Sequence, residues 1–214
     1  MNRRTVAGLL LIASPVVHIA SSFFWPAGSD GSPATQLATA AAHPGALTAA
    51  TVTEAVGWLM LLPALVVLWS EVRGRGRVLV GIGAWGAVLG VFGFFAGTIL
   101  NLVSIVLAGQ PDGLGVFRAL RDDGRIGVVA LVPLLVGVLS LVVLLAGLAR
   151  ARLAAWWQPV LGAVAVVVTE GLLPDSAGPV LSAAAFAPMA AALIAVGVRL
   201  SVASPARAAE PAFA

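Results

Sequence analysis

The sequence predicts an all-α membrane protein, a polytopic bundle of six transmembrane helices with both termini in the cytoplasm. Of its 214 residues, 60% are hydrophobic and only 10% are charged, and the mean hydropathy is +1.06. Soluble domains carry about a quarter charged residues, so a soluble fold is excluded. Several uncharged runs also reach the roughly 20 residues that a helix needs to cross a bilayer.

The first two spans are separated by a long polar loop. Thr5–Phe24 is an apolar run that is either a membrane helix or a secretory signal peptide. A membrane helix is favoured, because the run is longer than a signal core and no convincing A-x-A site follows it directly. Trp25 and Pro26 end the run, and a Gly/Ser/Pro/Ala loop is expected to about Ala46. Leu47–Ser70 then forms the second span.

The third span, Val78–Gly109, contains no charged residue and carries a stripe of glycines at spacings of four, three and four. Glycines on one helical face allow neighbouring backbones to touch. We therefore expect this helix at the bundle centre, and the stripe also offers a surface for a homo-oligomer. The glycines are Gly86, Gly90, Gly93 and Gly97.

The second half of the chain also contains long apolar runs. Gln110–Arg125 mixes charges with apolar residues at helical spacing, as in a short amphipathic helix on the membrane surface. One domain, 1–200, is expected, followed by a disordered Ala/Pro-rich tail, 201–214. The three remaining spans are Ile126–Ala149, Leu153–Leu173 and Pro179–Val198.

The arginines predict the orientation. Six spans put both termini on one side, and that side holds nine of the twelve basic residues, all of which are arginine. Basic residues concentrate in cytoplasmic loops, so the termini are expected in the cytoplasm and the protein in the inner (plasma) membrane of the cell. The nine are Arg3, Arg4, Arg73, Arg75, Arg77, Arg150, Arg152, Arg199 and Arg207.

Composition narrows the chemistry. The absence of cysteine excludes disulfides and thiolate sites, and two histidines do not build a His-rich metal centre or a bis-His haem site. The sequence has no phosphate-binding glycine loop with a lysine, and its arginines lie in short loops as topology signals rather than on a nucleic-acid surface. We expect no metal, no cofactor and no nucleic-acid partner.

Ionisable groups inside spans are costly and are candidate functional residues. His18 and Glu54 each lie roughly 10 Å below the outer end of their spans, Asn101 lies near that depth, and Glu170 is shallower, at roughly 5 Å. The four groups thus share the outer half of the membrane. Each also has a structural interpretation, as an interhelical hydrogen bond or a solvated helix end.

Glu54 is the sharpest of these signals. An apolar environment favours the protonated form of a carboxyl group, which makes Glu54 a candidate proton donor. Aromatic side chains, whose faces attract cations, occur on the surrounding spans. The candidate substrate-binding residues are Asn101 and the aromatic residues Trp58, Phe23, Phe24, Phe94, Phe95 and Phe186.

Three features carry a resemblance to known families: the opening Arg-Arg-Thr-Val-Ala-Gly-Leu-Leu, the carboxylate Glu54 early in the second span, and the stretch Ala151–Gly162. In these the chain resembles six-helix bacterial membrane proteins of unknown function. In size, hydrophobicity and intramembrane carboxylates it is also similar to membrane-bound terpene cyclases of bacterial indole-terpenoid and fungal meroterpenoid pathways. That resemblance implies cofactor-free, acid-started cyclisation of a prenyl chain, although the fungal group has seven spans rather than six.

Three functions follow as hypotheses. In a terpene cyclase, Glu54 with Glu170 would protonate a prenylated, bilayer-dissolved substrate, and His18 or a carboxylate would take the final proton. In a proton-coupled carrier for a small hydrophobic or cationic solute, the two carboxylates would alternate between proton and solute. In a structural subunit, the polar groups would only join helices.

Overall fold

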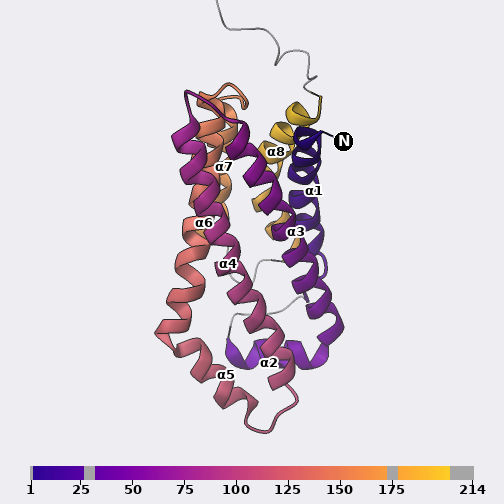
Figure 1. Ribbon diagram of the computed structural model, residues 1–214. Helices are drawn as coiled ribbons and strands as arrows, with labels where there is room; N and C mark the ends of the chain where they lie inside the picture. Colours follow the sequence, from indigo (N-terminus) through magenta and orange to yellow (C-terminus); the bar gives the residue numbers. More distant parts are fainter. Residues whose placement is uncertain (1, 27–31, 173–177, 203–214) are drawn as a thin grey trace, which may run out of the picture.

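The computed structural model describes residues 2–26, 32–172 and 178–202. Its regular structure in these ranges is entirely helical (Figure 1). This confirms the predicted all-α class. The elements are α1 (Arg3–Ser22), α2 (Pro33–Ala42), α3 (Pro44–Glu71), α4 (Arg77–Leu107), α5 (Gly113–Asp122), α6 (Gly124–Arg150), α7 (Trp157–Val166), the π-helical segment η1 (Val167–Leu172) and α8 (Pro179–Val202).

Five of these helices, α1, α3, α4, α6 and α8, are long and apolar enough to cross a membrane. The predicted fifth span is shorter than expected. α7 and η1 have 10 and 6 residues, at most about 24 Å of helix against a hydrocarbon core of about 30 Å. The helix begins at Trp157 rather than near Leu153, because Arg152 adopts a left-handed conformation with φ of 61° and the chain reverses there.

The long helices and α7 form a closed ring in which each packs on the next: α1, α3, α4, α6, α7, α8 and again α1. α1 begins and α8 ends at the same end of the bundle (Figure 1). The largest part of the core fills the ring toward that end, with apolar side chains from α3, α6 and α8. Its largest members include Leu61, Leu65, Leu68, Leu141, Leu144, Leu145, Leu148, Met189 and Leu193.

The glycine stripe joins α4 to α6. A Cβ at Gly90 would overlap the Cα of Gly137, and one at Gly86 would overlap Ser140, whereas a Cβ at Gly97 would meet nothing within 4 Å. The glycines predicted that α4 lies at the bundle centre. It is instead one member of the ring. Its other face exposes large apolar side chains, including Trp85 and Phe92, as a lipid-facing surface would. A self-association through Gly86, Gly90 and Gly93 would have to displace α6.

Two shorter helices lie at the other end of the bundle (Figure 1). The loop expected to about Ala46 contains α2, because Pro33 occupies its first turn and the Ser32 hydroxyl caps it by accepting from the Thr35 amide. α5 confirms the predicted amphipathic helix and buries Phe117. The predicted tail lies outside the described residues from 203 onward, and α8 continues to Val202.

Candidate functional site

His18 on α1 and Glu54 on α3 meet inside the membrane-spanning part of the bundle. The His18 Nδ1 and Glu54 Oε1 atoms are 3.7 Å apart, and the two side chains are only 19% and 16% exposed. Glu54 lies about 15 Å along α3 from its first residue. Gly57, one turn further on, lets the two helices approach closely. A Cβ there would lie 3.2 Å from the Ser14 carbonyl oxygen and 3.3 Å from the His18 backbone nitrogen.

Four of the six predicted aromatic residues gather beside this pair. The His18 ring lies 5.5 Å from that of Trp58, edge to face, and 4.3 Å from that of Phe186. Trp58 in turn contacts Phe94 at 5.4 Å, and Phe94 contacts Phe95 at 6.5 Å. α1, α3, α4 and α8 thus all contribute to one cluster of rings around His18.

Phe23 and Phe24 do not join the cluster. α1 ends at Ser22, two residues earlier than predicted, and these rings are 60% and 46% exposed on the turn that follows. That same turn folds Trp25 back, and its side chain forms a hydrogen bond with the Glu54 carboxyl group. Because an indole nitrogen only donates, the carboxyl oxygen is the acceptor.

The sequence interpretation missed this role of Trp25 and treated the residue only as the end of the first apolar run. The signal that pointed to it is its position: it directly follows the helix that carries His18. A short turn is enough to bring such a residue back to the same site.

Several buried polar atoms near the pair lack a hydrogen-bond partner among the described residues. They are His18 Nδ1, Trp58 Nε1, Thr51 Oγ1 and Thr98 Oγ1. The antiparallel register set by the Trp58–Phe94 and Trp69–Trp85 ring contacts puts Thr98 near the level of Glu54. The half of the ring away from the start of α1 is therefore more polar than the hydropathy of its helices suggests.

A small void adjoins His18, Trp58 and Phe186. Its volume is about 10 Å³, close to the least that one water molecule needs. A prenyl chain does not fit this void with the side chains as they stand. The pair is closely packed rather than open to a substrate cavity on this side.

Of the two remaining predicted site residues, Asn101 makes no hydrogen bond with His18 or Glu54. It lies seven residues beyond Phe94, about 10 Å along α4. Its backbone carbonyl accepts from the Ser104 hydroxyl, and its side chain makes no hydrogen bond within the described part of the chain. Glu170 belongs to η1 by its backbone, but its side chain lies outside what the structure describes.

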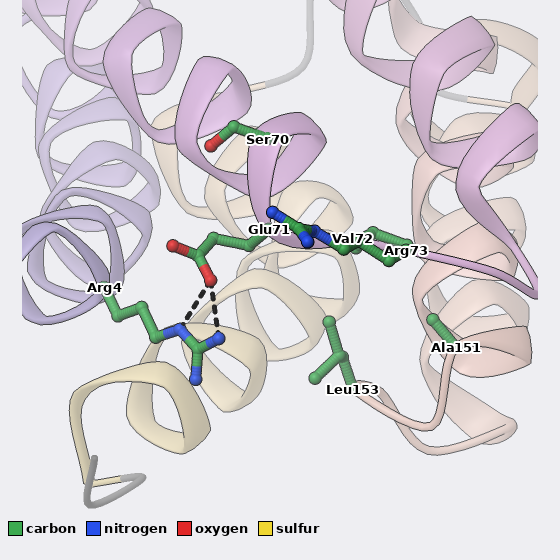
Figure 2. Close-up of a pocket in the computed structure, with 7 residues that line it drawn as sticks. All are labelled: Arg4, Ser70, Glu71, Val72, Arg73, Ala151 and Leu153. Atoms are coloured by element: carbon green, nitrogen blue, oxygen red, sulfur yellow. Dashed lines mark hydrogen bonds and ion pairs between the residues drawn. The ribbon is translucent and has the colours of Figure 1, made fainter. Parts of the chain in front are cut away.

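A second polar site, also missed from the sequence, lies at the end of the bundle where α1 begins. Arg4 of α1 donates from Nε to Glu71 Oε2 of α3 at 2.7 Å, and its Nη2 contacts the same oxygen (Figure 2). The arginines here were interpreted only as topology signals. Arg4 and Glu71 line a pocket of about 390 Å³.

Comparison with known proteins adds no family to this picture: no protein-family model, curated protein or solved structure matches the chain. The fold and the site alone define its class, an all-α membrane protein. It carries an acid and a base in contact within its spans. The chemistry open to such a pair is the uptake, exchange and release of a proton.

Proposed function

We propose that the chain crosses the plasma membrane six times, with both termini in the cytoplasm and α7–η1 as a short fifth crossing. Two observations support this topology. α1 begins and α8 ends at one end of the bundle, which requires an even number of crossings (Figure 1). That end also carries eight of the nine arginines that predict the cytoplasmic side, the ninth being Arg207 beyond α8.

We propose further that the protein is a proton-coupled carrier of a small hydrophobic or cationic solute, with Glu54 as its proton-binding group. The observation that carries this proposal is the 3.7 Å contact between Glu54 and His18 across two different helices. A carboxyl group and an imidazole at this distance can share one proton, either as two neutral groups or as an ion pair. A small relative movement of α1 and α3 changes which arrangement is favoured.

The aromatic cluster suggests the solute class. Trp58, Phe94 and Phe186 present ring faces and edges beside the proton-binding pair. A cation that displaces the proton from Glu54 would be stabilised by the carboxylate and by ring quadrupoles together. Proton and solute then compete for one carboxylate, which is the requirement for exchange.

The terpene cyclase is the second candidate, and the same aromatic cluster favours it, because ring faces also stabilise carbocations. The Glu54 carboxyl group is however engaged by Trp25 and faces His18, a base that would compete for the proton needed by an alkene. We therefore place the carrier first.

The deciding experiment measures proton flux in proteoliposomes that hold a pH-sensitive dye, with tetraphenylphosphonium or ethidium as the probe cation. The wild type should show cation-dependent proton flux, and Glu54→Gln should abolish it. Asp112→Asn, which removes an exposed carboxylate outside the spans, should keep the flux. Melting temperatures in detergent would verify that both variants are folded.

Two outcomes would count against this proposal. If neither probe cation drives proton flux, the assignment of lipophilic cations as the solute is wrong. If membranes with the wild type but not with Glu54→Gln convert a prenylated aromatic substrate to an isomer of unchanged mass, the cyclase replaces it. A Glu54→Gln variant that loses only stability, in a wild type that shows neither activity, would leave the pair a structural contact.

A further inference from the structure

The pocket beside Arg4 lies at the end of the bundle where α1 begins. It is formed by the first turn of α1, by the end of α3 with the residues that follow it, and by the turn after α6 (Figure 2). Its volume of about 390 Å³ falls in the range of sites for small ligands. The lining residues are Arg4, Ser70, Glu71, Val72, Arg73, Ala151 and Leu153.

The charges of this pocket favour an anion. The lining contains two guanidinium groups and one carboxylate, so its net charge is positive. Arg4 spends two of its five N–H donors on a single oxygen of Glu71, and Arg73 has no hydrogen bond or ion pair within the described residues. The unused guanidinium donors match the oxygens of a phosphate group, whereas the Ser70 hydroxyl already donates to the Val67 carbonyl at 2.8 Å.

The local backbone holds Arg73 at this place. α3 ends at Glu71, and the glycines that follow, Gly74 and Gly76, adopt left-handed φ values of 70° and 91°. Residues with a side chain rarely adopt such angles, so the glycines allow the tight turn into α4. Arg73 is exposed, and the turn keeps it beside the end of α3, where it lines the pocket.

The position of the pocket indicates which kind of molecule would bring the phosphate group. Glu71 and Arg4 belong to the terminal turns of two membrane spans, which puts the pocket at the boundary between hydrocarbon and water. Its walls also include apolar residues, Val72 and Leu153. A ligand with a phosphate and an adjoining apolar part satisfies both kinds of wall, and basic pockets between membrane helices are suited to lipid headgroups.

We propose that this pocket binds the phosphate of an anionic phospholipid in the leaflet at the arginine-rich end. The lipid phosphate contacts Arg73 and the free donors of Arg4, and its acyl chains run down the outside of the bundle. This site is separate from the Glu54–His18 pair and does not depend on the carrier proposal. It would hold equally if the protein carried no solute.

The test measures lipid binding by native mass spectrometry of the full chain in detergent, titrated with phosphatidylglycerol or phosphatidylcholine. Phosphatidylglycerol should bind more tightly. Arg73→Gln should weaken it by about fivefold, the loss expected for one arginine at a membrane surface. Arg75→Gln, which removes a neighbouring arginine that does not line the pocket, should weaken it by less than about twofold.

Two further measurements use Glu71→Gln and inorganic phosphate. Glu71→Gln should raise the affinity for phosphatidylglycerol, because it removes the competing carboxylate and frees Arg4. Equal losses for Arg73→Gln and Arg75→Gln would show a diffuse basic surface and overturn the pocket. If inorganic phosphate binds and phosphatidylglycerol does not, the ligand is a free phosphate and the lipid assignment is wrong.

Discussion

Gln158 illustrates how a single polar side chain holds two helices together at the start of α7. It is fully buried; its amide oxygen accepts from the Ala155 backbone, and its amide nitrogen donates to the Ala192 carbonyl of α8 at 3.2 Å. We expect Gln158→Leu to lower the free energy of unfolding by about 1–3 kcal/mol, because a buried amide and a buried carbonyl lose their partners. Unfolding in detergent with increasing denaturant measures this.

The matched control is Gln110→Leu, at an exposed position between α4 and α5. Surface substitutions of this kind change stability by within about 0.5 kcal/mol. Equal stability of the two variants would contradict the bridging role of Gln158.

The same contrast explains which site residues the sequence can predict. His18 and Glu54 were found because an ionisable group in an apolar run is costly whatever its neighbours are. Gln158 and Trp25 were missed because each stands next to a span boundary, where polar and aromatic residues are ordinary. Their partners become visible only when the turns beside them are folded.

At the scale of helices, the contact between α4 and α6 depends on bare glycine. We expect Gly90→Ala to destabilise the protein by about 1–3 kcal/mol, because the new Cβ would overlap the Gly137 backbone and force the helices apart. Gly97→Ala belongs to the same stripe but meets nothing within 4 Å. It should leave stability unchanged or raise it by up to about 1 kcal/mol, through better helix propensity.

Thermal unfolding of the two variants under identical detergent conditions provides the comparison. A Gly90→Ala protein as stable as Gly97→Ala would mean that the α4–α6 contact yields easily. The glycine spacing predicted a close helix contact correctly. It could not identify α6 as the partner, because a stripe of small residues fits any helix that presents a small face, such as the one around Gly137.

The hydrophobic pattern does not predict where the shorter helices begin. α2 was missed because the glycine, serine and proline residues just before it indicate a loop, although its alanines favour a helix, and its start depends on the Ser32 cap. The late start of α7 depends on the left-handed Arg152, a conformation that no hydrophobic pattern encodes. Long uncharged runs, in contrast, were located well, since the cost of exposing polar backbone in lipid leaves few alternatives to a helix.

At the scale of the molecule, the proposed topology can be tested directly because the chain contains no cysteine. A cysteine at position 110, between α4 and α5, should react with a membrane-impermeant maleimide added to intact cells. A cysteine at position 75, between α3 and α4, should react only after the cells are made permeable. The reverse pattern would contradict cytoplasmic termini, and reaction of both in intact cells would contradict the crossing of α4.

The ring also has a consequence for the synthesis and assembly of the protein. α1 and α8 are neighbours, and Gly8 and Gly197 bring their backbones into contact, yet α1 leaves the ribosome well before α8. At about 5–20 residues per second, α1 waits on the order of ten seconds for its partner. During that interval its α8-facing side must be covered by lipid or by the insertion machinery, so the ring closes only after its other helices have been made.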